Sequence, residues 1–351
     1  MISTPVSLRL RAQDRVLVLA PHPDDESIAC GGLLLAARAA GAAQRVVMLT
    51  DGDNNPWPQR WIEKRWRIDG VARARWGARR RAEAQAALDV LGVAGDERFF
   101  FGWPDMGLTD LLMREPTRVM QALVAQIDAF RPTHLAIPAL IDEHPDHSAV
   151  HIAARFALAH AQAAACLCYC VHGAKAGAQL LAVELDAGQR ELKQRAIQQH
   201  ETQMRLSHQR FLAFAGGDEI YLAFEQEQRG RADHPLDVAI NAKGLLELRL
   251  DARGMRGISS SHLLLAIEAD DGAALRWRMP LVADSVVELS DCSGKNAGEA
   301  YWRRYGNLLR AELKLPFASP LKLGFCKLAP NRAGLVVYDR YGWQTVRRKP
   351  L

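Results

Sequence analysis

The chain has 351 residues, of which 49% are hydrophobic and 24% charged, and its formal net charge is +5. These values are typical of a globular protein large enough for two domains, and they exclude a fibrous, disordered or disulfide-rich chain. The N-terminus lacks an apolar core of signal-peptide length, and no uninterrupted apolar run approaches a membrane span, so we expect a cytoplasmic protein.

The first two-thirds of the chain alternates strand-like and helix-like runs. Strands are predicted at 15–20, 45–50, 98–101, 133–138 and 166–171, and helices at 27–38, 77–91, 115–130, 147–164 and 189–206. Ser27 is the expected N-cap of the first helix, and Gly92 the expected C-cap of the second. This βαβ alternation predicts a largely parallel sheet with helices on both faces.

The pattern changes near residues 230–235, and short runs of alternating polarity follow. They lie at 245–250, 262–267, 275–279, 309–315 and 334–338. Such runs predict an antiparallel sandwich or barrel-like module. We therefore expect a catalytic domain at 1–230 and an accessory β-rich domain at 231–351. The module either supports the fold or binds a glycan, and its candidate exposed aromatic residues are Trp277, Tyr301, Trp302 and Trp343.

The stretch 57–81 is both basic and aromatic. It holds nine basic residues, two acidic ones and four tryptophans. One interpretation is a solvated helix with some tryptophan packing. The other is a cationic flap over the site that grips an anionic or sugar-bearing substrate, or a contact with a membrane surface. No nucleic-acid-binding signature accompanies the charge, so a nucleic-acid partner is not expected.

Two polar clusters follow predicted strands. His22-Pro23-Asp24-Asp25-Glu26 comes directly after strand 15–20, and His144-Pro145-Asp146-His147 comes after strand 133–138. Ligand sites of α/β folds lie at the carboxyl edge of the sheet, so the two loops can meet there. Taken singly, each cluster could be no more than a polar helix start. The two together predict a metal site.

The residue types suit a catalytic zinc site, which takes three protein ligands and leaves one position open. We expect His22, Asp25 and His147 as ligands and Asp24 as general base. His144 is placed to protonate the leaving nitrogen or stabilise the oxyanion, with Asp146 holding its tautomer. The histidines outside the two clusters are interpreted as structural or surface groups: His134, His151, His160, His172 and His200.

The paired clusters resemble the LmbE/PIG-L family of zinc-dependent de-N-acetylases. Further matches are Leu49-Thr50-Asp51-Gly52, the Arg80-to-Glu83 helix segment and the loop around Asp105. The resemblance covers about residues 13–230. It implies a Rossmann-like α/β fold, Zn²⁺ at His22, Asp25 and His147, Asp24 as base and His144 as acid or oxyanion stabiliser. It also suggests Arg80 and Asp105 as sugar contacts.

The expected function is removal of acetyl from an N-acetylated amino sugar, with release of acetate. The substrate class is a GlcNAc-type glycan, a glycolipid or an intermediate derived from a sugar nucleotide. A metal-dependent amidase acting on another N-acyl amino-sugar conjugate is the alternative, because the same site would serve it. A non-catalytic glycan-binding protein is a third hypothesis, which the intact set of ligands and base disfavours.

Overall fold

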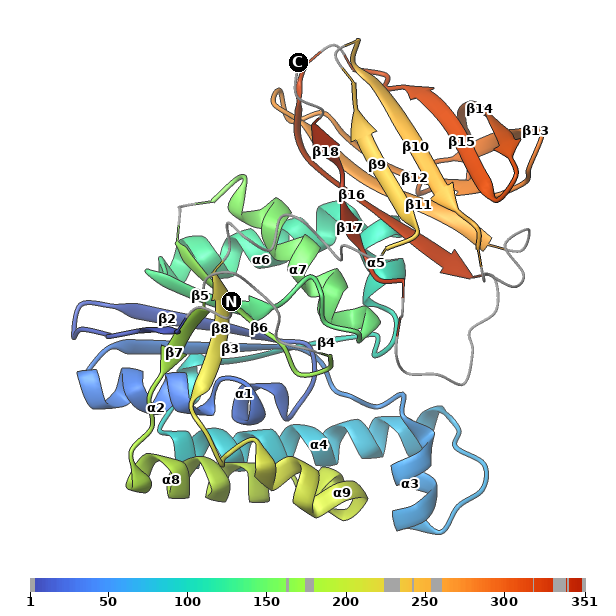
Figure 1. Cartoon of the computed structure of the whole chain (residues 1–351). Helices are drawn as coiled ribbons and strands as arrows, with labels where there is room; N and C mark the ends of the chain where they lie inside the picture. The colour runs from blue at the N-terminus through green and yellow to red at the C-terminus, as the bar shows by residue number, and fades with distance from the viewer. Residues whose placement is uncertain are drawn as a thin grey trace.

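The computed structural model describes residues 4–161, 164–173, 180–223, 234–241, 243–253, 261–317, 319–330, 339 and 341–348. Within these residues the strands form an eight-stranded sheet and a separate ten-stranded sheet. Figure 1 shows the first sheet between two helix layers, with the second sheet beside one of those layers. The expected domain boundary at 230/231 and the expected strand 334–338 lie outside the described residues.

The first sheet has the order β1-β7-β8-β6-β5-β2-β3-β4, and only β8 runs antiparallel to its neighbours. Its strands are β1 Val6–Ser7, β2 Arg15–Ala20, β3 Ala43–Thr50, β4 Arg98–Trp103, β5 His134–Pro138, β6 Ala165–Tyr169, β7 Leu180–Val183 and β8 Glu219–Ala223. The central strands are apolar without interruption because helices cover both faces. On β2, for instance, Leu17 and Leu19 pack on one side, and Val16 and Val18 on the other. The predicted parallel-rich α/β sheet is confirmed.

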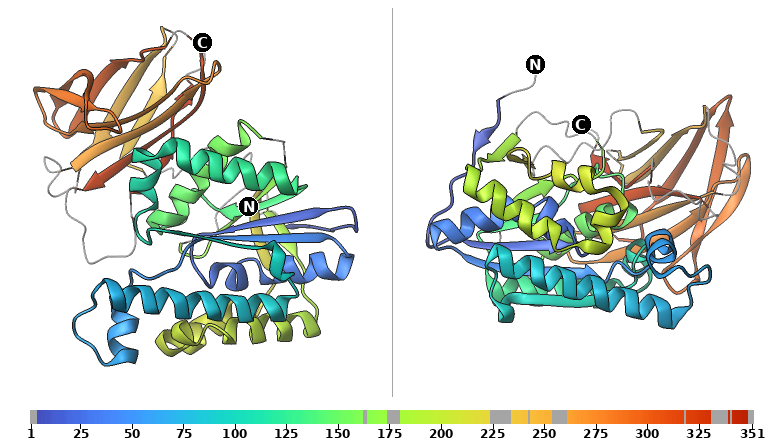
Figure 2. Two further views of the ribbon diagram at one scale, coloured as in Figure 1. Left: turned by 180° about the vertical axis from the view of Figure 1, so that it is seen from behind. Right: turned by 90° about the horizontal axis from the view of Figure 1, so that it is seen from below.

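The helices form a layer on each face of this sheet. The described helices are α1 Asp25–Ile28, α2 Gly31–Ala40, α3 Pro56–Glu63, α4 Gly70–Leu91, α5 Leu108–Arg114, α6 Pro116–Phe130, α7 Pro145–Leu158, α8 Ala187–Gln198 and α9 Glu201–Ala213, with a short 3₁₀ turn at Gly95–Glu97. Helices α5, α6 and α7 lie on one face; α1, α2, α4, α8 and α9 lie on the other (Figures 1 and 2). None of the helices described is long and apolar enough to cross a membrane.

Two predicted helices are each divided in two, and the expected helix 189–206 appears as α8 and α9. The expected helix 27–38 appears as α1 and α2, and Ser27 lies inside α1 instead of capping it. Helix α2 starts afresh because the buried Glu219 carboxylate accepts the backbone N–H groups of Gly32 and Leu33 at 2.6 and 2.8 Å. A Cβ on Gly32 would lie 2.8 Å from that carboxylate, so the close approach requires glycine. The predicted C-cap is confirmed: Gly92 ends α4 with φ +81°.

The second sheet is antiparallel except for the parallel pair of β9 and β18, and it forms a barrel-like module, here called the barrel. Its described strands are β9 Leu236–Ile240, β10 Leu245–Asp251, β11 Ser261–Ala269, β12 Ala274–Pro280, β13 Ser285–Ser290, β14 Asn296–Tyr305, β15 Leu308–Lys314, β16 Leu321–Pro330, β17 Gln344–Thr345 and β18 Arg347–Arg348. Strands β17 and β18 lie at opposite ends of the sheet order but are neighbours in sequence. The chain therefore joins the two edges.

The tryptophans proposed as exposed sugar-stacking groups are core residues. Trp277, Trp302 and Trp343 are 7%, 0% and 1% exposed, whereas Tyr301 is 45% exposed. Period-two alternation indicates that a strand has two faces, but it does not say which face a closed sheet turns inward. Trp302 also donates its indole N–H to Pro280 O at 3.0 Å, so its polar atom is satisfied inside the barrel.

The barrel packs on the helix layer formed by α5, α6 and α7, and this contact is here called the seam. Leu264, Ala266, Phe325 and Trp343 of the barrel belong to the same hydrophobic cluster as these helices. At its centre the Phe156 ring of α7 meets Phe325 edge to face, with 5.6 Å between centroids. The seam therefore joins the barrel to the helix that carries His147.

Candidate active site

The two polar loops meet at one edge of the first sheet, as the sequence predicts. Strands β2 and β5 are parallel neighbours, so their carboxyl ends lie side by side. The His22 ring, after β2, lies 4.6 Å from the His144 ring and 5.4 Å from the His147 ring, between centroids. Pro145 starts α7 directly after His144, which sets His144 and His147 one helical turn apart.

His22 is surrounded by carboxylates. Its Nδ1 lies 3.3 Å from Asp25 Oδ2, and its Nε2 lies 3.2 Å from Asp105 Oδ1 and 3.3 Å from Asp146 Oδ2. Burial alone would lower the pKa of His22, but these carboxylates raise it well above its usual value. The site is thus a buried, acidic cluster that favours a cation.

His147 is completely buried and lies between two carboxylates. Its Nε2 is 3.3 Å from Asp25 Oδ2 and its Nδ1 is 3.2 Å from Asp142 Oδ2. Against the effect of burial, Asp142 and Asp25 raise the pKa of His147 to about 10. Asp142, which no sequence motif marks, also accepts the backbone N–H of His144 at 3.0 Å. Carboxylates behind metal-binding imidazoles commonly have this position.

The donor set fits a divalent metal ion. Neither ring nitrogen of the buried His147 has a partner in hydrogen-bond geometry. Asp25 Oδ2 lies 3.3 Å from both His22 Nδ1 and His147 Nε2, and two tetrahedral zinc ligands lie about 3.3 Å apart.

Two further sets of three donors lie within 4.8 Å of one another among the described residues: His22 with His144 and His147, and His22 with Asp105 and Asp146. His22 is common to both sets. Asp25 belongs to neither, although it touches two of the expected ligands.

Asp24 precedes α1 with a strained backbone, φ 135° and ψ −30°. The carboxylate of Glu26 accepts its backbone N–H at 2.9 Å, and Arg80 donates to its Oδ2 at 3.1 Å. Burial raises the pKa of Asp24 to about 6, against the opposing charge of Arg80. A buried carboxyl whose pKa is close to neutral is suited to proton transfer at physiological pH.

His144 is held in one tautomer by the backbone. Its Nδ1 accepts the N–H of Asp146 at 3.2 Å, so the neutral ring carries its proton on Nε2. Burial and the neighbouring His22 and His147 lower its pKa well below the usual value. The Asp146 carboxylate does not lie on His144 as expected. It lies against His22 and accepts the N–H groups of Met106 and Leu108.

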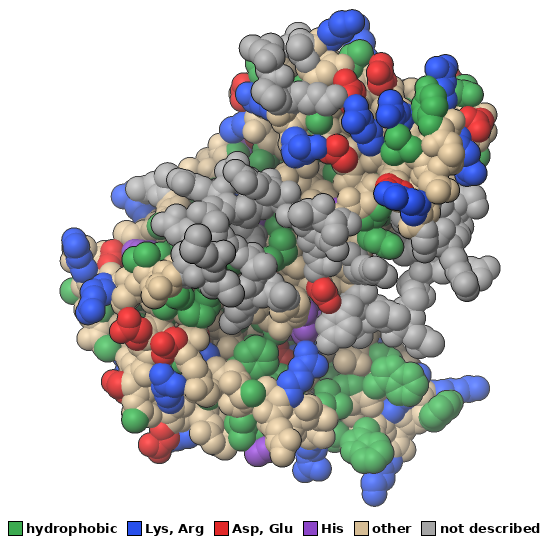
Figure 3. All heavy atoms as spheres, viewed as in Figure 1, with side chains coloured by type: hydrophobic (Ala, Val, Ile, Leu, Met, Phe, Trp, Pro, Cys, Tyr) green, Lys and Arg blue, Asp and Glu red, His purple; other side chains and the backbone are tan. Residues whose placement is uncertain are grey.

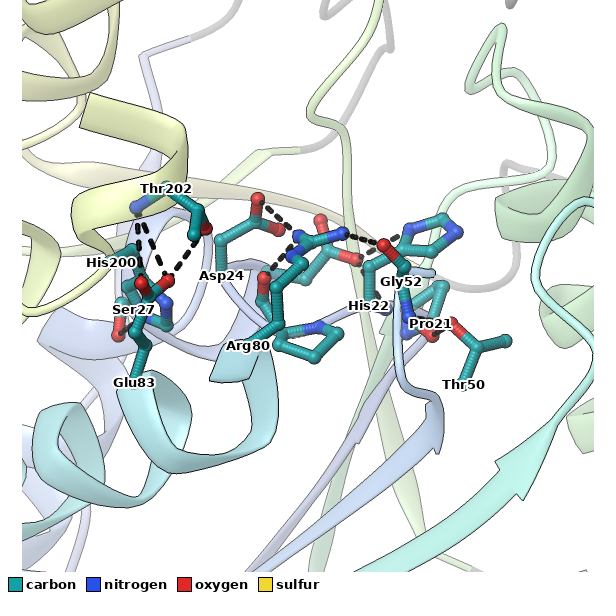
Figure 4. A network of polar contacts seen from close by, with 12 residues as sticks. Pro21, His22, Asp24, Ser27, Thr50, Gly52, Arg80, Glu83, His200 and Thr202 are labelled. Carbon is teal, nitrogen blue, oxygen red and sulfur yellow. Dashed lines mark hydrogen bonds and ion pairs between the residues drawn. The ribbon is translucent and has the colours of Figure 1, made fainter. Parts of the chain in front are cut away.

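Arg80 lies beneath the site and is 6% exposed. Its guanidinium donates to Pro23 O at 2.6 Å and Gly52 O at 2.7 Å as well as to Asp24 (Figure 4). A Cβ on Gly52, which has φ +61°, would overlap this guanidinium. Arg80 thereby fixes both loops around the base. Its contact with a sugar, like that of Asp105, stays a prediction.

Two histidines interpreted as structural or surface groups lie at the site. His200, before α9, is buried and its Nε2 lies 2.8 Å from Glu26 Oε1, directly behind Asp24. The His172 ring, after β6, lies 5.6 Å from the His144 ring and 5.3 Å from the His147 ring. Both come from segments without a local motif, so only the folded chain brings them to the site.

Residues 17–158 match the family model described as "PIG-L: GlcNAc-PI de-N-acetylase". Over these residues the chain is similar to the PIG-L family. This match confirms the resemblance predicted from the paired His-Asp and His-His loops, which both lie inside the matched residues.

Curated relatives match the same part of the chain. Over 164 residues it is 34% identical to the 1D-myo-inositol 2-acetamido-2-deoxy-alpha-D-glucopyranoside deacetylase of Mycobacterium sp. (strain KMS), covering 42% of this chain and 51% of the relative. The protein of the same name in Mycobacterium avium (strain 104) is 37% identical over 148 residues, covering 38% and 47%. The chain thus spans about half the length of the curated relatives it matches.

Solved structures resemble the chain more distantly. The A40926 pseudoaglycone deacetylase Dbv21 is 20% identical with a TM-score of 0.48, covering 60% of this chain and 97% of that one. The N,N'-diacetylchitobiose deacetylase of Pyrococcus horikoshii is 21% identical with a TM-score of 0.46, covering 59% and 83%.

Proposed function

We propose that the protein is a Zn²⁺-dependent hydrolase that removes acetyl from an N-acetylated amino sugar, giving acetate and a free amine. The observation that carries the proposal is the placement of Asp24 and His144 beside the buried cluster of His22, Asp25 and His147. The curated relatives named as deacetylases of an acetamido sugar support the same reaction.

We assign His22, Asp25 and His147 as the metal ligands. Asp25 Oδ2 is the donor that touches both imidazoles, and Asp142 orients His147 from behind. The chemistry that Zn²⁺ supplies in such a site is Lewis-acid activation of a water molecule and of the amide carbonyl.

The residues around the ligands perform the proton transfers. Asp24 accepts the proton of the attacking water, since its carboxylate is ionised above a pKa of about 6. His144 presents Nε2–H, which donates a hydrogen bond to the carbonyl oxygen as that oxygen gains negative charge. The proton that Asp24 took from the water passes to the leaving nitrogen. The amide C–N bond breaks, the water oxygen stays on the acetyl carbon, and the nitrogen leaves as an amine.

Metal analysis tests the ligand assignment. We expect purified His22→Ala, Asp25→Ala and His147→Ala proteins to lose most bound zinc, and Asp51→Asn to keep it. Asp51 is a matched control because it forms a half-buried pair with Arg81, at 2.7 Å, in the next loop of the same sheet edge. Full zinc occupancy in Asp25→Ala, with loss in Asp105→Ala, would move the ligand set to the alternative group.

Acetate release across a panel of N-acetyl and longer N-acyl amino sugars tests the reaction. We expect turnover of at least one N-acetyl sugar, abolished by a chelator and restored by Zn²⁺. Release of only the longer acyl groups would make the protein an amidase of another class. Zinc-loaded protein that binds glycans without hydrolysing any of them would refute the enzymatic proposal.

We also propose the sheet type, the domain bounds, the location and the charge of the substrate. We propose that the first sheet is Rossmann-like, which its order β6-β5-β2-β3-β4 supports. The proposed domains remain 1–230 and 231–351, the proposed location remains the cytoplasm, and an anionic group on the substrate remains part of the proposal.

A further inference from the structure

Three tryptophans are exposed together on α3 and the loop that follows it. Trp57, Trp61 and Trp66 are 54%, 77% and 78% exposed. The guanidinium of Arg60 lies 5.0 Å from the Trp57 ring and 5.4 Å from the Trp66 ring, and its Nε donates to Trp66 O at 2.9 Å. The Arg60 guanidinium therefore links the rings of Trp57 and Trp66. Figure 3 shows hydrophobic side chains interspersed with Lys and Arg at the lower right, where Figure 1 draws α3.

The same surface is strongly basic. Arg60, Lys64, Arg65 and Arg67 stand against one acidic residue, Glu63, in the stretch 60–67. Glu63 is already engaged by Arg75, at 2.6 Å, so it does not neutralise this group. We call Trp57, Trp61 and Trp66 with these four basic residues the basic tryptophan surface.

Helix α3 turns this surface away from the protein. Pro58 and Gln59 form its buried side, and the Gln59 side chain donates to Ala72 O at 2.6 Å. Trp57 and Trp61, four residues apart, share the opposite side. The exposed rings thus face away from the described residues against which α3 packs.

We propose that the basic tryptophan surface docks the protein on an anionic lipid membrane. Tryptophan rings favour the boundary between headgroups and acyl chains, and basic side chains beside them attract anionic headgroups. Protein interfaces are also rich in tryptophan and arginine, so a protein partner is an outcome that the vesicle test must separate from a membrane. This inference does not depend on the proposed deacetylation.

Docking would place the catalytic site at the lipid surface. The segment that leads into α3 touches the site directly: Asn54 donates its backbone N–H to Asp105 at 2.7 Å. A substrate held in the membrane by a lipid tail would therefore meet a protein whose active-site loop continues directly into the docked helix.

Vesicle binding tests the proposal on the full-length protein. We expect the protein to co-sediment with vesicles of phosphatidylcholine and phosphatidylglycerol. Its binding to vesicles of pure phosphatidylcholine should be at least about tenfold weaker, and high salt should weaken its binding to the anionic vesicles. Equal binding to both vesicles, or binding to neither, would overturn it.

Paired variants locate the contact. Trp61→Ala/Trp66→Ala and, separately, Arg65→Glu/Arg67→Glu should each lower the partition coefficient about tenfold or more. Tyr301→Ala/Tyr305→Ala is the matched control, because these rings are 45% and 51% exposed on the barrel. Circular dichroism checks that each variant is folded. Unchanged binding in both test variants would refute the assignment. The assignment would also be refuted if the parent protein forms a dimer, Trp61→Ala/Trp66→Ala is monomeric, and neither protein binds vesicles.

Discussion

The two sheets of the molecule place their buried charges differently. In the α/β part, buried charged and imidazole groups gather at the carboxyl edge of the sheet, around His22, Asp25 and His147. In the barrel, the buried charged residues Glu268, Arg276 and Lys327 face the other part of the molecule.

The contacts of these barrel residues are specific. Glu268 pairs with His160 at 2.9 Å, and the guanidinium of Arg276 lies 4.2 Å from the Phe156 ring. Lys327 pairs with Asp339, whose backbone N–H donates to Glu143 O at 2.6 Å in the loop before His144. In the α/β part the buried charges thus surround the candidate active site, and in the barrel they attach the barrel to the α/β part. The barrel supports the active-site loop from outside, and its own interior is apolar.

The largest effect is expected at the candidate active site. Asp24→Asn removes the proposed base but keeps the shape of the side chain, so we expect kcat to fall by about 10²- to 10⁴-fold with zinc still bound. Acetate release and metal content measure the two properties on one sample. Asp51→Asn should keep both. Near-normal turnover in Asp24→Asn would mean that this site is not the catalytic one.

The next effect is expected at the seam. Phe156→Ala removes a fully buried ring that contacts Phe325 and Arg276, and such truncations cost about 3–5 kcal/mol in the free energy of unfolding. Urea unfolding followed by circular dichroism measures it. Val286→Ala, at a barrel position that is 60% exposed, should stay within about 0.5 kcal/mol of the parent. Equal values for the two variants would show that the seam contributes nothing to stability.

Much of the α/β part could be predicted because its rules are local. His22 and His144 each lie in the loop after an apolar strand, and this placement predicts both the sheet and the edge where the side chains meet. Gly92 was readable for the same reason, since a left-handed C-cap needs glycine.

The remaining features depend on contacts between distant segments. Helix α2 begins where it does because of Glu219, and His200 reaches Asp24 only through Glu26. Asp142 has no motif of its own. The burial of Trp277 and Trp302 follows from closure of the barrel, which alternation along a strand does not encode.

A smaller effect is expected in the pH dependence of the unfolding free energy, and it arises at His151. His151, on α7, is buried with its Nδ1 2.9 Å from Pro138 O. Burial and the nearby Arg155 charge lower its pKa to about 3. The unfolded chain therefore takes up a proton near pH 6.5 that the folded chain refuses, and stability falls as the pH decreases from about 6 to about 4.

His151→Gln should remove this contribution. The slope of unfolding free energy against pH should decrease by about 1.4 kcal/mol per pH unit in that range, measured by urea unfolding at several pH values. His208→Gln, at an exposed position on α9, is the control and should leave the slope unchanged. An unaltered slope in His151→Gln would contradict the assignment.

The smallest effect is expected where charge is exposed. Arg347 and Asp237 join β18 to β9 at 2.5 Å, but their side chains are 59% and 41% exposed. Such pairs contribute about 0.2–1 kcal/mol. A double-mutant cycle with Arg347→Ala and Asp237→Ala measures the coupling. A coupling energy larger than the loss of unfolding free energy in Phe156→Ala would contradict this order of effects.

The backbone of Asp24 has an evolutionary consequence. Its φ of 135° is a conformation that glycine adopts freely and that other residues adopt only when their surroundings enforce it. Selection for thermostability alone would therefore replace this aspartate by glycine, which would relieve the strain and delete the base. The position records a trade-off between activity and stability, and descendants of this chain that have abandoned the reaction should show it first at residue 24.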